Sequence, residues 1–318
     1  MKRVFLLLFL SAIFPLAMQG QQDIHQQLSH VVLLEQKGQY EQAIRIIESL
    51  MEANSTDNVE IGRAWTMLGV AYEELGHYQQ SRNAYEQAVR LLEGDSQHLA
   101  QYANALDGFA TLNNLTQHPE IADKLWSKAL AIHKQLADHL AVAKEYTFLA
   151  GIEFQRKQTG PAKKYLKRAI EEAALMGNVS EADSVFLSDT RAWLANMEGD
   201  SKTELVAYQR SLELRKHGHS EDSPLTGWNY LFVGNAYADN KDCAQAMTNI
   251  REGIQILDRT LGQQNPQYLS AETFYAKVLD KCGKHEEATT LKLQAKQGMT
   301  DLLKQQCVTC TVSVASLR

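Results

Sequence analysis

The chain has 318 residues, with 32 lysines and arginines against 38 aspartates and glutamates, and a formal net charge of −6. Because nucleic-acid phosphates require a basic surface, this acidic balance argues against DNA or RNA as a partner. The sequence also has no G-x-S-x-G, H-E-x-x-H, G-x-x-x-x-G-K-[ST] or G-x-G-x-x-G motif. We therefore expect neither catalysis nor a bound cofactor.

Residues 1–20 have the pattern of a secretory signal peptide. Lys2 and Arg3 precede an apolar run over residues 4–17, which is too short to span a bilayer comfortably. Retention as an uncleaved membrane anchor is the alternative. Cleavage near Gly20 would leave 30 basic against 38 acidic residues, and no later segment is apolar enough to cross a membrane. We expect an exported protein, periplasmic or secreted, and the short basic leader is typical of bacteria.

A repeat occupies residues 21–305. At intervals of 38 to 42 residues, seven repeats begin at Ile24, Gly62, Ala103, Ala143, Val185, Gly227 and Leu269. The eighth, twentieth and twenty-seventh positions of each repeat give 21 sites, of which 18 hold Ala, Gly or Ser. Two helices approach closely only where their contact residues are small. The pattern therefore predicts two packed helices in each repeat.

Larger side chains are expected to fill the space between these points of close approach. They include Leu34, Tyr72, Phe154, Tyr237 and Leu279. Glycine, which can adopt the left-handed conformation that ends a helix, marks the turn between the two helices of four repeats. These glycines are Gly38, Gly76, Gly199 and Gly283. Residues 306–318 have an extended, strand-like pattern instead and form a separate C-terminal tail.

The second repeat, Trp65-x-x-Leu68-Gly69-x-x-Tyr72 followed by Ser81, Tyr85 and Ala88, carries a recognisable signature. It resembles the tetratricopeptide repeat (TPR) family, whose pattern is W-x2-L-G-x2-Y…A-x3-F…A. The resemblance covers residues 24 to about 300 and implies an all-α superhelical solenoid of about seven helix-turn-helix repeats. The repeats are longer than usual, and residues 261–270 are similar to the loop of the long-repeat, kinesin-light-chain-like subclass. Glu204 at a small-residue site and Pro119 at a turn depart from the pattern.

The resemblance implies a binding function, because TPR proteins bind protein segments in a groove lined by the first helix of each repeat. Carried onto this chain, the candidate groove residues are Arg63, Glu73, Asn104, Asn114, Lys144, Arg156, Trp193, Asn196, Trp228 and Asn235. Asparagine can pair with a peptide backbone, Lys144 and Arg156 could hold a carboxylate, and tryptophans dominate binding hot spots. We expect a protein- or peptide-binding scaffold, or alternatively a non-binding structural spacer. Thr66 and Val70 replace the Lys/Asn set that binds chaperone tails.

The four cysteines allow three interpretations. Cys243 and Cys282 fall at the turns of neighbouring repeats, and an even number in an exported chain favours disulfides. Cys307 and Cys310 could form a second disulfide in the tail. Redox activity is an alternative, although a catalytic C-x-x-C opens a helix and this pair follows one. Zinc is another, with Cys282-x2-His285 and Cys307-x2-Cys310 as ligand pairs; we expect no metal.

Overall fold

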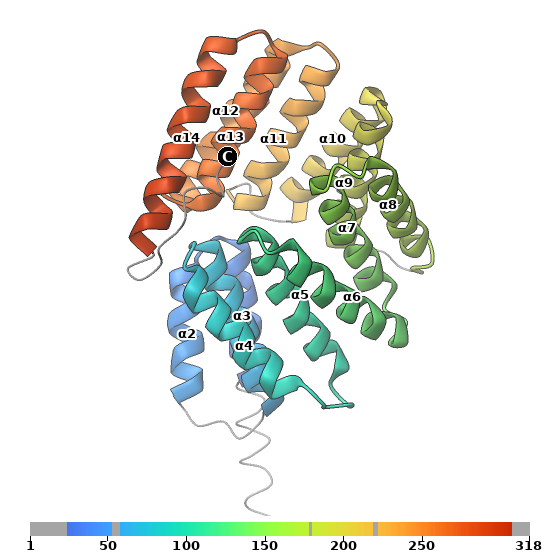
Figure 1. The fold of residues 1–318 in the computed structure, drawn as a ribbon, viewed down its shortest axis with the longest axis vertical. Helices are drawn as coiled ribbons and strands as arrows, with labels where there is room; N and C mark the ends of the chain where they lie inside the picture. The colour runs from blue at the N-terminus through green and yellow to red at the C-terminus, as the bar shows by residue number, and fades with distance from the viewer. Residues whose placement is uncertain (1–23, 53–57, 178–179, 219–221, 307–318) are drawn as a thin grey trace, which may run out of the picture. The chain divides into compact units, whose positions relative to one another are not determined.

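The computed structural model describes residues 24–52, 58–177, 180–218 and 222–306 (Figure 1). These residues form 14 helices and no strands, and 85% of them are helical, as the all-α prediction requires. After the helix over residues 24–36 come α2 (Tyr40–Glu52), α3 (Asn58–Glu74), α4 (Tyr78–Leu92), α5 (Leu99–Leu115), α6 (Pro119–Gln135), α7 (His139–Gln155), α8 (Thr159–Ala173), α9 (Glu181–Glu198), α10 (Ser201–Gly218), α11 (Pro224–Asp239), α12 (Cys243–Leu261), α13 (Pro266–Lys281) and α14 (His285–Gln306).

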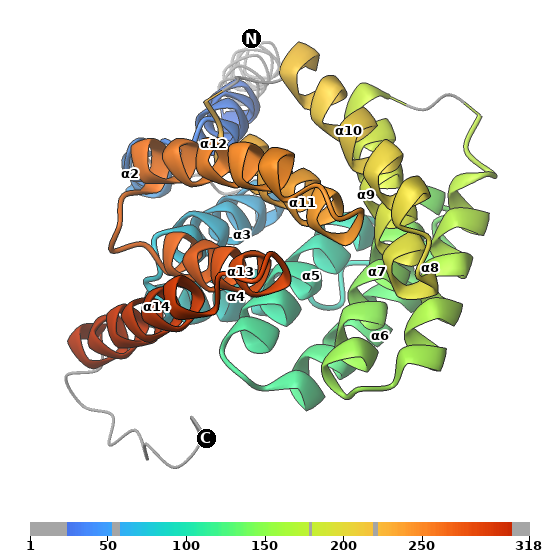
Figure 2. The same cartoon turned by 90° about the horizontal axis from the view of Figure 1, so that it is seen from above.

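The helices belong to two compact units. Unit 1 comprises Met1–Glu73 and Tyr78–Ala137, and unit 2 comprises Glu74–His77 and Asp138–Arg318. In unit 1, α5 packs against both α4 and α6. In unit 2, α7 pairs with α8, α9 with α10, α11 with α12, and α13 with α14, and each pair contacts the next along the chain. Figure 2 shows α11 beside α12 and α13 beside α14. The predicted order of helical hairpins is confirmed.

The small-residue positions lie where the helices meet. All 21 of these residues are buried, the three larger members among them included. At Gly69 an added Cβ would come within 2.7 Å of the Tyr85 ring, and at Gly234 within 2.7 Å of Ile250. Tyr85 and Ile250 are themselves almost fully buried. The periodicity therefore arises from steric contact inside each hairpin.

The turn inside every hairpin contains one residue in the left-handed conformation, always the fifteenth of its repeat. In four repeats it is glycine; in the other three it is Gln117, Lys157 or Lys241, with φ of 64°, 62° and 67°. The next residue often closes the turn, as where the His118 N–H donates to the Asn113 carbonyl at 2.7 Å. Such bonds satisfy the carbonyls at the end of the first helix. The same backbone turn thus forms with or without glycine.

Both departures from the repeat pattern have a structural explanation. Glu204 is only 1% exposed, and its carboxylate accepts a hydrogen bond of 3.3 Å from the Asn235 amide of the next repeat. A polar partner therefore replaces the close contact that a small residue provides elsewhere. Pro119 is the first residue of α6, where its missing N–H is not needed.

The ends of the chain lie outside the described residues. The signal segment over residues 1–20 and the C-terminal tail, with Cys307 and Cys310, therefore stay predictions. Within the described part, no helix combines the length and apolar character needed to cross a membrane.

Candidate partner-binding surface

Unit 2 exposes an aromatic pair formed by helices of two successive repeats. Phe154 lies at the end of α7 and is 53% exposed, although the sequence pattern assigned it to the packing between helices. Its ring forms an edge-to-face contact with Trp193 on α9, with the ring centres 6.2 Å apart and the planes at 84°. Exposed aromatic rings held in a defined orientation are typical anchors of protein interfaces.

The core beneath this pair holds Trp193 in position. Trp193 is half-buried and packs at the margin of a cluster formed by Ala150, Ala162 and Leu166. The indole also lies beside Gly151 on α7. A Cβ added at Gly151 would lie 3.8 Å from Trp193 Cη2, which is an ordinary van der Waals contact, so the indole is not crowded there. One side of the indole is therefore fixed by packing while the aromatic pair keeps an exposed edge.

A polar network begins one helical turn after Trp193. The Asn196 amide lies 3.5 Å from Asp239 Oδ2, and the Asn235 amide donates to the same carboxylate at 3.1 Å. Lys281 Nζ lies 2.7 Å from both Asp239 oxygens and 2.8 Å from Asn235 Oδ1. Asn235 also reaches Glu204, so its hydrogen-bonding groups are engaged within the fold. Asn196 is exposed and can reach a ligand.

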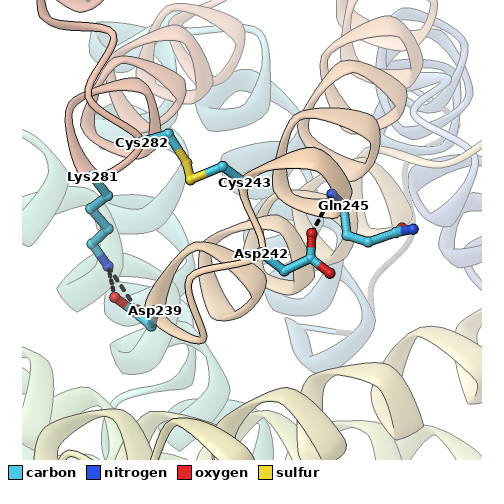
Figure 3. The surroundings of a disulfide bond; sticks show 6 residues. All are labelled: Asp239, Asp242, Cys243, Gln245, Lys281 and Cys282. Carbon is cyan, nitrogen blue, oxygen red and sulfur yellow. Dashed lines mark hydrogen bonds and ion pairs between the residues drawn. A yellow bond between two sulfur atoms is a disulfide. The ribbon is translucent and has the colours of Figure 1, made fainter.

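A disulfide between Cys243 and Cys282 lies beside this network (Figure 3). Cys243 opens α12, where the Asp242 side chain caps the helix by accepting from the Gln245 N–H at 3.0 Å. Cys282 follows α13 immediately and is the neighbour of Lys281. The repeat pattern predicts that these two cysteines lie at the turns of neighbouring repeats, and the predicted disulfide is confirmed.

This disulfide bears on both chemical alternatives. The zinc alternative requires a Cys282 thiolate, which the bond to Cys243 removes. The redox alternative at Cys307 and Cys310 concerns residues outside the described part of the chain.

Trp228 lies in a second aromatic group rather than with Trp193. Its ring centre is 5.9 Å from that of Phe232 and 6.2 Å from that of Phe274. Its indole N–H donates to Gln267 Oε1 at 3.3 Å. These contacts across α11 and α13 make Trp228 a packing residue between neighbouring repeats.

The two cationic candidates of unit 2 differ in setting. Arg156 follows α7 and pairs with Glu153 at 2.9 Å, one turn earlier on the same helix. A pair this exposed contributes little to stability, and the guanidinium can exchange this partner for another carboxylate. Lys144 is half-buried near the start of α7. The positive charge nearest in sequence to the exposed Phe154 ring is therefore that of Arg156.

The remaining four candidates belong to unit 1. Arg63 donates to both oxygens of Glu60 at 2.9 Å. Glu73 accepts from the Tyr85 hydroxyl at 3.4 Å. Asn104 is exposed, whereas Asn114 is half-buried.

Comparison with known proteins supports the repeat assignment. Residues 28–94 match the model of the tetratricopeptide repeat family. The fold resembles the Rap conjugation gene regulator of plasmid pLS20 in complex with the Phr* peptide, with a TM-score of 0.67, 13% identity, and coverage of 91% of this chain and 77% of that one. Residues 28–94 are thus tetratricopeptide repeats, and the described chain has the fold of a tetratricopeptide repeat protein.

Two further solved structures share the fold. RapI in its apo form gives a TM-score of 0.60 at 12% identity, covering 88% of this chain and 99% of its own. A Rap protein complexed with Competence and Sporulation Factor gives 0.56 at 12% identity, covering 89% and 99%. No curated protein shows significant similarity to this TPR chain. Identities this low establish the fold alone, and the kinesin-light-chain-like subclass stays a prediction.

Proposed function

We propose that this TPR protein is an exported scaffold that binds an extended segment of another protein and has no catalytic activity of its own. The surface that we assign to binding is formed by the first helices of the fourth and fifth repeats, α7 and α9. Phe154 and Trp193 anchor the segment there, and Asn196 pairs with its backbone. Arg156 attracts an acidic or carboxylate group.

The exposed aromatic pair is the observation on which the proposal depends. Burying Phe154 inside a hairpin would have been favourable by about 25 cal/mol for each Å² of apolar surface removed from water. The chain leaves this ring 53% exposed and supports it with a half-buried tryptophan. Among similar folds, the pLS20 Rap regulator was solved with a peptide and another Rap protein with Competence and Sporulation Factor. This is consistent with the proposal that this TPR chain also accepts a polypeptide.

A displayed peptide library selected on the folded wild-type protein provides ligands for the test. The dissociation constant of each selected peptide is then measured by fluorescence polarisation against wild type, Phe154→Ala and Arg156→Glu. We expect Phe154→Ala to weaken binding roughly fivefold or more, because truncating an interface hot spot costs more than about 1 kcal/mol. Arg156→Glu should weaken only peptides that carry acidic groups.

Val206→Ala is the matched control, because Val206 is an apolar residue of the same unit that is 67% exposed but lies on α10. It should bind the peptides like wild type, and all variants should keep the wild-type melting temperature. Equal affinities for wild type and Phe154→Ala would contradict the proposed surface. Trp193→Ala is the harder variant, since the indole also packs against the core.

Export is tested separately by intact mass. Protein recovered from the cell envelope should have the mass of a chain that begins at Gln21. A membrane-bound product that retains residues 1–20 would support the anchor instead.

A further inference from the structure

Unit 1 contains a cavity whose lining residues are not part of the proposed binding surface of unit 2. It has a volume of about 470 Å³ and is formed by α2, α3 and α4. Volumes of this size are typical of sites for small molecules or single side chains. Trp65, Leu68 and Tyr72 contribute from α3, and Met51 adds an apolar side chain from α2. The lining from α3 is thus aromatic and apolar.

The lining from the other two helices is polar and acidic. Glu48 and Glu52 lie one turn apart on α2, so both carboxylates face the same side of that helix. Gln80 and Asn83 line the cavity from α4 with side-chain amides. Among the described lining residues there are two carboxylates and no basic side chain.

The two arginines nearest to the cavity in sequence do not neutralise the negative charge of its lining. Arg82, on α4 between Gln80 and Asn83, lies over the Phe109 ring at 6.0 Å, and so is directed towards α5. Arg63 on α3 is held by Glu60. Neither arginine lines the cavity.

One hydrogen bond orients the acidic wall. The Tyr72 hydroxyl donates to Glu48 Oε1 at 2.9 Å, which fixes this carboxylate beside the aromatic lining. Burial, together with the Glu48 carboxylate, raises the pKa of the Tyr72 hydroxyl, so the group remains a neutral donor at physiological pH. The second oxygen of Glu48 and the exposed carboxylate of Glu52 remain available to a ligand.

We propose that this cavity binds an organic cation on an apolar stem, an alkylguanidinium or alkylammonium group. The stem lies against Met51 and Leu68, and the cation lies between the Trp65 ring and the carboxylates of Glu48 and Glu52. Aromatic faces attract cations through their quadrupole, tryptophan most strongly. A guanidinium can also donate to two carboxylates at once. The cation comes either from a free small molecule or from an arginine or lysine side chain of a polypeptide.

The test uses nuclear magnetic resonance of the four tryptophan indole N–H groups of the full chain, with the Trp65 signal assigned from Trp65→Phe. The protein is titrated with n-butylguanidinium, n-butylammonium and, as the anionic control, butyrate. We expect both cations to shift the Trp65 signal selectively, with dissociation constants on the order of 1 mM. Added salt should weaken this binding, and butyrate should leave the signal unchanged.

The carboxylates are tested by Glu52→Gln and by Glu48→Gln together with Glu52→Gln. Both changes keep the side-chain size, and a glutamine at residue 48 can still accept from the Tyr72 hydroxyl. We expect roughly two- to fivefold weaker cation binding for the single variant and roughly tenfold for the double variant. Glu86→Gln is the matched control, because Glu86 is exposed on α4 but does not line the cavity.

Three results would overturn the proposal. They are a Trp65 signal that no cation shifts, butyrate binding equal to cation binding, and unchanged affinity in a double variant with wild-type circular dichroism. A capped arginine-containing tripeptide then distinguishes the two sources. Tighter binding than n-butylguanidinium indicates a polypeptide side chain, and weaker or equal binding indicates a free organic cation.

Discussion

At the scale of single residues, Glu204 shows how a polar side chain can occupy a position that the repeat reserves for small ones. Burial raises its pKa, with Asp239 adding to the effect, while Asn196, Asn235 and Lys281 act in the opposite direction. The folded protein therefore binds the Glu204 proton more tightly than the unfolded chain does. The contribution of this group to the free energy of unfolding must fall as the pH rises above about 4.5 through the raised folded-state pKa.

Replacing Glu204 with glutamine removes this titration and keeps an acceptor for the Asn235 amide. We expect the stability of Glu204→Gln, relative to wild type, to increase as the pH rises above about 4.5 and to level off once the pH exceeds the raised folded-state pKa of Glu204. Urea unfolding at several pH values measures the difference, in which the other titrating groups largely cancel. Glu213→Gln, on the exposed side of the same helix, should give a nearly flat difference. A Glu204→Gln difference that is equally flat would contradict the burial argument.

At the scale of the element, the hairpin depends on how closely its two helices approach. In the second repeat, Ser81 Oγ donates to the Gly69 carbonyl at 2.8 Å, and the Tyr85 ring fills the space beside Gly69. Gly69→Leu should therefore destabilise the protein by roughly 1–3 kcal/mol through overpacking. Chemical unfolding followed by circular dichroism measures this change.

Gly160 provides the opposite control. It lies in the first turn of α8, and an added Cβ would meet nothing within 4 Å. Gly160→Ala should change the stability by less than Gly69→Leu does, because its Cβ meets no packed residue. The helical conformation before Pro161 is disfavoured for alanine, which offsets the gain from the reduced freedom of the unfolded chain. If Gly69→Leu were tolerated as well as Gly160→Ala, the assigned repeat register would be wrong.

At the scale of the whole molecule, stability should be distributed along the chain, because repeats interact mainly with their neighbours. The disulfide links residues 39 apart in sequence. In the chain-entropy model, a closed segment of this length stabilises the folded state by up to about 4 kcal/mol. We expect the double variant Cys243→Ala and Cys282→Ala to raise amide hydrogen exchange in α11 to α14 and to leave α5 and α6 unchanged. A uniform rise along the chain would show that the molecule opens as one cooperative body.

Much of the architecture could be predicted from the sequence because it depends on local periodicity. Small residues at fixed intervals determine where two helices meet, and they located every hairpin. The partners of polar side chains could not be predicted in this way. Asn235 and Glu204 lie 31 residues apart, so their contact depends on how two repeats stack.

The binding candidates show the same limit. The repeat pattern predicts that Phe154 packs between helices, because it lies near the eleventh position of the repeat, which holds large residues such as Leu34 and Leu279. Proximity to this position does not distinguish a side chain that faces the core from one that faces water. Trp228, a candidate for the groove, also contacts Phe232 of its own repeat and Phe274 of the next, which the pattern did not reveal, and its role in binding stays a prediction. The cavity of unit 1 requires three helices at once, and no pattern within one helix reveals it.

The turns inside the hairpins have a practical consequence for engineering heat resistance. Gln117, Lys157 and Lys241 hold a backbone conformation that costs side-chain-bearing residues roughly 1–2 kcal/mol and glycine nothing. Replacing each of these residues with glycine would remove that cost and stabilise the fold. The greater freedom of glycine in the unfolded chain would offset part of the stabilisation. Because the three turns belong to different hairpins, their effects should add. A triple glycine variant would thus be a more thermostable version of the same scaffold, altered only at residues that bridge two helices.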